Sequence, residues 1–186
     1  QYKEIDFLSN DIKIIPIKGP EQYLNIEGDI SHKTINLDSE QLSLFFKQVP
    51  ESFKNVKLSS DSNFFVKVKK NKIKKYGVNS KINLDKFNYE IDQSKIKKYI
   101  PDFKGSIDFE DHEIEMSIKD DVFTVQGEGH YLIATEPEKI NYKITSNRKA
   151  NFISFETKVN IHESLLDVEF LNYRKKENKD STLFIE

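Results

Sequence analysis

The sequence predicts a mainly β protein: an antiparallel meander forming a curved, groove-like open sheet, with two short helices. Three observations predict this class. Apolar residues recur at every second position through most of the chain, which is the period of a strand. Turn-forming residues separate these runs at short intervals, and short returns favour antiparallel neighbours. Within the strands, charged side chains gather on one face only. A β-sandwich, in which a second sheet covers the apolar face, is the alternative architecture.

Composition limits the classes of protein to consider. The chain has 186 residues, enough for one domain with its own core, and 12% aromatic residues argue against disorder. The formal net charge of −2 gives no overall attraction to nucleic acid or to membranes. The absence of cysteine excludes disulfides and thiolate metal sites. No apolar run is long enough to span a membrane. The chain begins at Gln1 without a signal peptide, so we interpret residues 1–186 as a single β-rich segment of a larger protein.

Short strands are expected over residues 1–38. Pro16, the Gly19-Pro20 pair and the Gly28-Asp29 pair punctuate this stretch as turn residues. The apolar pairs that mark the strands are Ile5/Phe7, Ile12/Ile14, Leu24/Ile26 and Ile35/Leu37.

Two helices interrupt the strands. Apolar residues at helical spacing predict a helix over 39–49, which Pro50 ends. A second helix is expected over 94–100, capped by Ser94 and ended by Pro101. The two helix-to-proline stretches resemble each other and each precedes a set of strands, which suggests an internal repeat. The candidate repeat units are residues 39–93 and 94–186.

A lysine-rich hairpin tip is predicted over 67–75, centred on Asn71. A change of parity near Asp85-Lys86 then indicates a turn or a bulge. The lysines are candidates for contact with lipid headgroups or, less well supported by the charge balance, with nucleic acid. The simpler interpretation is a solvated hairpin whose lysines discourage aggregation. The candidate headgroup contacts are Lys67, Lys69, Lys70 and Lys72.

The central feature of the second half is a hairpin over 122–144 with a return at 135–139. Gly127 and Gly129 share the parity of its apolar residues. Glycine inside a strand marks a bend or a close approach, so we expect a hollow or a curl on this face. The further turns are expected at 110–113, 119–121, 146–151 and 162–164, with a bulge between Phe170 and the residues after it and a last strand from Leu183.

The expected strands of the second half leave one face almost free of charge. That face could be covered by a second sheet, or it could contact the acyl chains of lipids, since either role needs an apolar surface. Its candidate lipid-contacting residues are Ile107, Phe109, Ile114, Met116, Ile118, Phe123, Val125, Gly127, Gly129, Tyr131, Ile133, Ile140, Tyr142, Ile144, Ile153, Phe155, Val159, Ile161, Leu166, Val168 and Phe170.

No catalytic or metal-binding pattern stands out. The four histidines, at positions 32, 112, 130 and 162, are not spaced as zinc ligands. No motif for a calcium loop, a phosphate loop or a nucleophilic serine is present. The carboxylates lie in turns, and no pair is marked for glycoside hydrolysis. The residues alone therefore mark no catalytic or metal site.

Residues 101–185 resemble the AsmA-like proteins of Gram-negative envelopes, relatives of the bridge-like lipid-transfer proteins. The resemblance is a rhythm of proline, glycine and strands after a short helix. The stretches that carry it are Gly105-Ser106-Ile107, Gly127-Glu128-Gly129, Glu136-Pro137-Glu138-Lys139-Ile140-Asn141-Tyr142 and Leu171-Asn172-Tyr173-Arg174-Lys175-Lys176.

This resemblance implies a periplasmic segment of a larger protein that is anchored in the inner membrane outside residues 1–186. It also implies that the protein is not an enzyme and needs no cofactor. It further implies phospholipid as the partner, together with flanking segments of the same chain, and intermembrane lipid transport as the function. The alternatives are a self-contained β-sandwich acting as an adhesion or protein-interaction module and, less well supported, a hydrolase of envelope polymers.

Overall fold

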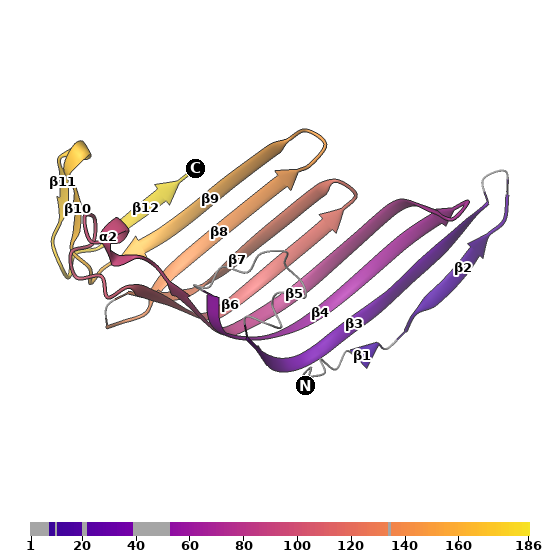
Figure 1. The fold of residues 1–186 in the computed structure, drawn as a ribbon, viewed down its shortest axis with the longest axis horizontal. Helices are drawn as coiled ribbons and strands as arrows, with labels where there is room; N and C mark the ends of the chain where they lie inside the picture. The colour runs from indigo at the N-terminus through magenta and orange to yellow at the C-terminus, as the bar shows by residue number, and fades with distance from the viewer. Residues whose placement is uncertain (1–7, 10, 20–21, 39–52, 134) are drawn as a thin grey trace.

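The computed structural model describes all residues except 1–7, 10, 20–21, 39–52 and 134, and it is dominated by one large antiparallel sheet. The sheet has ten strands, and its order follows the chain closely: β1-β3-β4-β5-β6-β7-β8-β9-β12, with β2 also paired to β3 (Figure 1). Its elements are β1 (Leu8–Ser9), β2 (Lys13–Ile17), β3 (Tyr23–Leu37), β4 (Phe53–Lys69), β5 (Lys72–Glu90), α2 (Gln93–Ile96), β6 (Ser106–Lys119), β7 (Val122–Leu132), β8 (Glu138–Asn147), β9 (Phe152–Ile161) and β12 (Ser181–Ile185).

The sheet is open rather than closed, because its two outermost strands do not pair with each other. This confirms the prediction of an open antiparallel meander. A second, two-stranded sheet of β10 (Leu166–Val168) and β11 (Tyr173–Lys175) lies beside the end of the large one (Figure 1). Within the described ranges these are the only two sheets, so no second layer of strands covers the large sheet as a β-sandwich would require.

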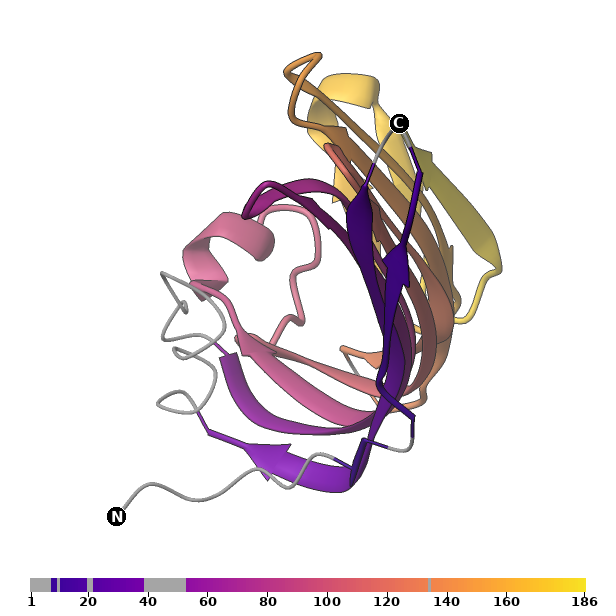
Figure 2. The ribbon, with the colours of Figure 1, turned by 90° about the vertical axis from the view of Figure 1, so that its right-hand side faces the viewer.

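Irregularities in neighbouring strands curl one end of the sheet (Figure 2). Register shifts fall between His32 and Ile35 of β3, after Lys54 in β4, and between Glu110 and Glu113 of β6. Opposite Lys57, strand β5 carries one extra residue at Asp85, so of the two predicted alternatives, a turn or a bulge, the structure has the bulge. Bulges bend a strand and increase its twist. Because these four lie in adjacent strands, their bends add up, and the sheet becomes a trough.

Several expected turns are bulges or ordinary strand residues instead. The stretch 110–113 lies inside the continuous strand β6, where Asp111 adopts a left-handed conformation with φ of 52°. The prediction of a turn there was wrong because a bulge changes parity as a turn does. Gly28-Asp29 likewise lies inside β3. In contrast, the lysine hairpin has the expected tight tip: Lys70 and Asn71 both have positive φ, as a two-residue return requires.

The helical content is lower than expected. The described residues contain one short α-helix, α2, followed by turns, where a helix over 94–100 was predicted. Asp92 caps it rather than Ser94: the Asp92 carboxylate accepts hydrogen bonds from the Ser94 backbone N–H at 3.0 Å and from its hydroxyl at 2.8 Å. The other expected helix, 39–49, lies outside the described residues. The proposed repeat begins there too and stays a prediction.

The core is small, as follows from a single-layer sheet. Leu37 and Val56 are buried at the curled end, and Ile35, Leu58, Leu84 and Phe87 pack against them. Phe103, which follows α2, is the most deeply buried large side chain of the described part, with 1% of its surface exposed. Most apolar side chains of the sheet are only half-buried.

Candidate functional site

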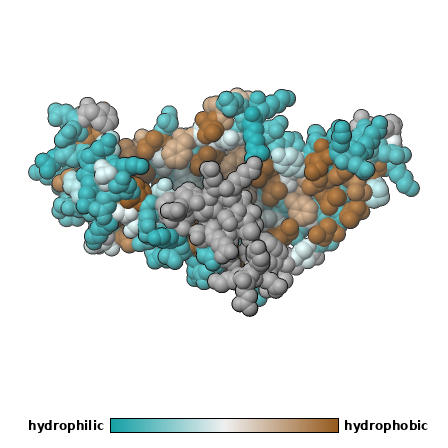
Figure 3. Space-filling model, in the orientation of Figure 1, coloured by the Kyte–Doolittle hydropathy of each residue, from teal (hydrophilic) through white to brown (hydrophobic). Residues whose placement is uncertain are grey.

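Strand register divides the sheet into an apolar face and a polar face. Met116, Val125, Ile144 and Phe155 are cross-strand partners in four adjacent strands, and they therefore share one side. Their chain neighbours, among them Glu115, fall on the opposite side. The apolar face is the one turned toward the viewer in Figures 1 and 3, and Figure 2 shows that this is the concave side of the curl. Brown, apolar patches are visible on it to either side of the grey atoms, among teal polar surface.

Most of the predicted lipid-contacting residues lie on this concave face. Those in β6, β7, β8 and β9 share it through their register, as predicted from their parity. Two at the β9 end are open to solvent: Ile153 is 74% exposed and Phe155 43%. Tyr131, in contrast, is buried, and its hydroxyl donates to the Asn160 carbonyl at 2.6 Å.

Four predicted residues lie elsewhere. Ile133 follows the end of β7 in a bend. Leu166 and Val168 belong to the small sheet with β11, so they do not continue the face of the large sheet. Phe170 lies in the 3₁₀ helix η1 (Glu169–Leu171), and its side chain is outside the described part. The expected bulge after Phe170 is instead the end of this helix, where Asn172 is left-handed with φ of 50°.

The space over the two glycines is filled by aromatic rings from adjacent strands. A Cβ on Gly127 would lie 2.6 Å from the Tyr142 hydroxyl, and one on Gly129 would overlap the His112 ring. His112 is 3% exposed; its Nδ1 lies 3.2 Å from the Tyr142 hydroxyl and its Nε2 lies 2.9 Å from the His130 carbonyl oxygen. The glycines therefore serve a close approach, and the hollow expected between them is occupied by the chain itself.

Burial also sets the acid–base behaviour of this pair. Desolvation lowers the pKa of His112, because the protonated ring loses more hydration than the neutral one. Desolvation raises the pKa of Tyr142 to about 12 for the corresponding reason, since the phenolate is the charged form. Both rings are therefore neutral near pH 7, and the pair is a packing feature of the apolar face.

The four candidate headgroup lysines lie at the β4–β5 hairpin. Lys69 and Lys72 are cross-strand partners beside the tip, and Lys70 is in the turn. The Lys67 ammonium lies over the Tyr23 ring, 5.2 Å from its centroid, which is cation–π geometry. Contact of these lysines with headgroups stays a prediction.

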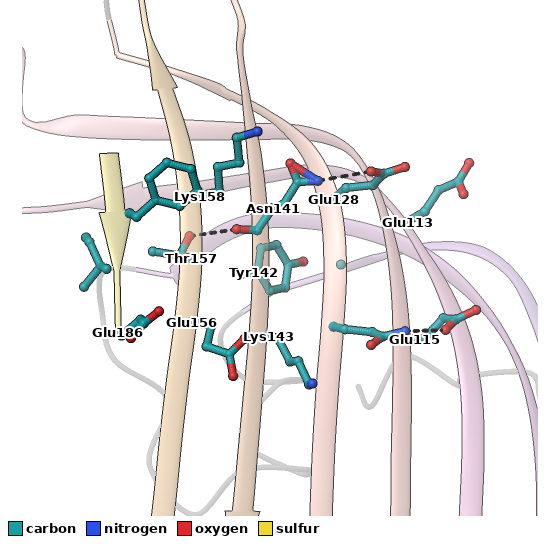
Figure 4. A pocket seen from close by; sticks show the side chains of 14 residues that line it. Glu113, Glu115, Glu128, Asn141, Tyr142, Lys143, Glu156, Thr157, Lys158 and Glu186 are labelled. Carbon is teal, nitrogen blue, oxygen red and sulfur yellow. Dashed lines mark hydrogen bonds between the residues drawn. The ribbon is translucent and has the colours of Figure 1, made fainter. Parts of the chain in front are cut away.

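The polar face carries two shallow grooves. We name the first the charged groove; it has a volume of about 540 Å³ and crosses β6 to β12 (Figure 4). The Gln126 amide donates to the Glu115 carboxylate at 2.8 Å, and the Asn141 amide donates to Glu128 at 3.1 Å. The Lys158 ammonium lies 5.7 Å from the centre of the Phe184 ring. The side chains of its polar lining are Glu113, Glu115, Gln126, Glu128, Asn141, Lys143, Glu156, Lys158 and Glu186.

The second, which we name the amide groove, has a volume of about 640 Å³ and crosses β3 to β7. Its side chains are mostly neutral and polar. The Asn79 amide donates to the Asn63 carbonyl oxygen at 3.1 Å, and the Ser117 hydroxyl donates to Asn79 at 3.0 Å. The polar side chains that line it from this face are Asp29, Ser31, Asp61, Asn63, Asn79, Lys81, Glu115, Ser117, Thr124 and Gln126.

The chemistry of the two grooves suits binding by hydrogen bonds. Amides, hydroxyls and carboxylates offer both donors and acceptors to a polar ligand. Among the described residues no group of three or more His, Asp or Glu side chains could hold a metal ion. Within the same ranges no helix is long and apolar enough to cross a membrane.

Sequence reasoning overlooked the polar face. The residues of this face are individually of the polar kinds found on the solvent-exposed side of any strand. No local sequence motif therefore marks the face as a binding site. The signal lies in the pairing: only the register of the successive strand pairs places Asp61 of β4 and Glu156 of β9 on one line across the sheet.

Comparison with known proteins identifies one family. A family model described as "Putative peptidoglycan binding domain" matches residues 35–130, just over half of the chain. No curated protein and no solved structure matches the chain significantly. The matched range contains β4, β5 and β6 and most of β7, and with them most of the amide groove. The match indicates a location in the cell envelope, which agrees with the broader part of the expected location.

Proposed function

The chain belongs to this family of peptidoglycan-binding domains, and on that premise we propose that it is a non-enzymatic module that binds peptidoglycan through the polar face of its open sheet. The observation that carries the proposal is the pair of grooves on that face. Peptidoglycan is a polymer of N-acetylated sugars, rich in hydroxyls and amides, with short peptide stems that carry both signs of charge. The amide groove offers the matching partners for the sugars.

The openness of the face also favours this function. A cross-linked polymer cannot enter a deep pocket, but it can lie on a shallow surface that is open at both ends. Most of the groove side chains that hydrogen-bond to one another are exposed, so they can exchange those bonds for bonds to a ligand. Exchange of this kind keeps the number of hydrogen bonds nearly constant, and specificity then depends on geometry.

The direct test is co-sedimentation of the purified chain with insoluble peptidoglycan sacculi. The wild-type chain should pellet with the sacculi. A double variant, Asn79→Ala with Gln126→Ala, removes groove amides from β5 and β7 and should bind roughly thirtyfold more weakly, since each of the two lost hydrogen bonds contributes about 1 kcal/mol.

Two control variants accompany this test. Ser154→Ala lies on the polar face of β9 outside both grooves and should bind as the wild type does. Ile153→Asp changes the opposite, concave face and should also pellet normally. Failure of the wild type to sediment with sacculi, in a sample with a cooperative melt, would overturn the proposal.

A second candidate function is lipid binding by the concave face. The observation that favours it is the exposure of Ile153 and Phe155 on a face whose strands carry apolar side chains in neighbouring rows. In this proposal the chain is a periplasmic segment of an inner-membrane-anchored, AsmA-like protein, and the apolar face contacts the acyl chains of phospholipids during intermembrane transport. Burying each methylene group of such a chain contributes roughly 0.8 kcal/mol.

Native mass spectrometry of the purified chain, with lipid extraction of the same sample, tests this second function. Co-purified phospholipid in stoichiometric amount supports it, and Ile153→Asp should then release the lipid without affecting sedimentation with sacculi. Ile153 is a better position than Gly127 or Phe123 for this substitution, because its exposed side chain can be replaced without disturbing packing. A lipid-free mass from a membrane-rich extract would count against it.

A further inference from the structure

We propose that a single extended glycan strand lies across the β-strands of the polar face, along one row of seven cross-strand partners that joins the two grooves. This inference rests on the proposed peptidoglycan-binding function. It adds the orientation of the ligand across the strands, the length of the binding track, and the part of peptidoglycan that is bound, the glycan. We name the line of residues the cross-strand row; it consists of Ser31, Asp61, Lys81, Glu115, Gln126, Lys143 and Glu156.

The register places the row without a gap. Each member is the direct partner of the next in the neighbouring strand, from Ser31 in β3 to Glu156 in β9. All seven side chains are polar, and all except the half-buried Ser31 are exposed. Direct partners in a sheet project from the same face, so the row presents one line of hydrogen-bonding groups.

The two grooves meet on this row. The amide groove contains its members from Ser31 to Gln126, and the charged groove contains those from Glu115 to Glu156. Glu115 and Gln126 therefore belong to both grooves, and their side chains are hydrogen-bonded to each other at 2.8 Å. A ligand that occupies either groove at this point can continue into the other.

The spacing of the row favours a polysaccharide over a peptide. Neighbouring strands lie about 4.8 Å apart, so the six steps of the row give a track about 29 Å long. A sugar ring in an extended β-1,4-linked chain advances by nearly the same distance as one strand spacing, which allows about one sugar for each strand. An extended peptide advances about 3.3 Å for each residue and falls out of step with the row.

The charges of the row point to a ligand with little net charge. Asp61, Glu115 and Glu156 alternate with Lys81 and Lys143 along the row. The row therefore contains three carboxylates and two ammonium groups. Such alternation creates no strong field of one sign, and its carboxylates repel a polyanion such as nucleic acid. An N-acetylated glycan backbone, with hydroxyls and amides but no charges, fits this line.

The test is the dependence of affinity on ligand length, measured by isothermal titration calorimetry on the full chain. The probes are chitin oligosaccharides, which have the same N-acetylated β-1,4-linked backbone, as the disaccharide, tetrasaccharide and hexasaccharide. Affinity should increase with each step and by at least about tenfold from the shortest probe to the longest, because more of the track becomes occupied.

Two double variants locate the track. Asp61→Ala with Lys81→Ala alters the amide-groove end, and Lys143→Ala with Glu156→Ala alters the charged-groove end; each pair leaves the net charge unchanged. Either should reduce hexasaccharide affinity to about that of the tetrasaccharide. The matched control is Lys57→Ala with Asp85→Ala, an ion pair of 3.0 Å that joins the same strands, β4 and β5, away from the row. It should leave the dependence on length intact.

The outcomes separate this inference from the function on which it rests. Equal affinity for all three oligosaccharides would overturn the proposed track. The track would also be overturned if free stem peptides displaced the chain from sacculi and oligosaccharides did not. In both cases the proposed function stands if the chain sediments with sacculi. If the chain does not sediment with sacculi, the proposed function itself fails.

Discussion

The imidazole of His112 fills the space that a side chain on Gly129 would need. The two residues belong to β6 and β7, next to the bulge that shifts the register between these strands. The ring is held from both of its nitrogens, by the Tyr142 hydroxyl and by the His130 carbonyl. It also stands edge-on to Phe109, with ring centres 5.7 Å apart. The absence of a side chain at Gly129 in β7 thus leaves room for the buried His112 ring from β6, at the point where the sheet begins to curl.

Gly129→Ala should destabilise the fold. The added methyl group overlaps the His112 ring, and overpacking of this kind costs about 1–3 kcal/mol. The free energy of unfolding, from urea denaturation, measures the effect. In a His112→Ala background the same change should cost much less, because the ring is gone. If Gly129→Ala costs the same free energy of unfolding in both backgrounds, overlap with the His112 ring is not the cause of the destabilisation.

The stability of the fold should fall as the pH decreases from about 7.5 to about 5. Burial lowers the pKa of His112 in the folded state, so in this range the unfolded chain binds more protons than the folded one, which favours unfolding. The contribution of His112 to the free energy of unfolding is fully present above the pKa of this histidine in the unfolded chain. It is lost as the pH falls toward the lower pKa of the folded state. Urea denaturation at both pH values checks this. The pH dependence should shrink in His112→Gln, and an unchanged dependence would exclude His112 as its source.

At alkaline pH the hydroxyl of Tyr142 should ionise late. Its pKa is raised to about 12 by burial, so the folded state resists the phenolate. Stability linked to this group is present below the pKa of an unfolded tyrosine, about 10, and is lost as the pH rises through the folded value. Ultraviolet difference titration of the wild type against Tyr142→Phe isolates its ionisation. Ionisation near pH 10 in the folded chain would contradict the prediction.

Lys175→Met should loosen the small sheet. Lys175 is 4% exposed, and its ammonium donates to the carbonyls of His162, Ser164 and Lys176 at 2.6, 2.8 and 3.1 Å. Methionine fills similar space but leaves buried carbonyls without a donor, at a cost of about 1–3 kcal/mol. Thermal denaturation measures this loss.

The exposed neighbour Lys176 provides the control. Lys176→Met removes the same charge and should change the melting temperature little. Hydrogen exchange of the β10 and β11 amides should speed up in the Lys175 variant only. If both variants melt alike, the three hydrogen bonds of Lys175 do not hold the small sheet in place.

Parity was sufficient to predict the faces of the strands that lack irregularities. In β7, Phe123, Val125 and Tyr131 share a face as the alternation indicated, because side chains in a regular strand must alternate. In β6 the same argument predicted a turn at 110–113, since Asp111 adds one residue and reverses the parity. Alternation alone does not distinguish a bulge, after which the chain continues, from a turn, after which it reverses.

The candidate site depends on information that alternation does not contain. Lys81 and Lys143 are far apart in the chain, and each resembles any solvated lysine. They belong to one line because every intervening strand pairs in a particular register, which the turns and bulges set. The family match over 35–130 then gives a functional meaning to a face that local patterns describe only as polar.

A sheet of one layer has a consequence for how this protein can change over generations. Because successive residues project to opposite sides, a substitution at an even or odd position alters one surface and leaves the other untouched. The two surfaces can therefore be refined for different ligands almost independently. Insertions and deletions are the exception: one residue gained or lost within a strand exchanges the surfaces beyond that point. Bulges such as that at Asp111 show where the fold has room for one extra residue.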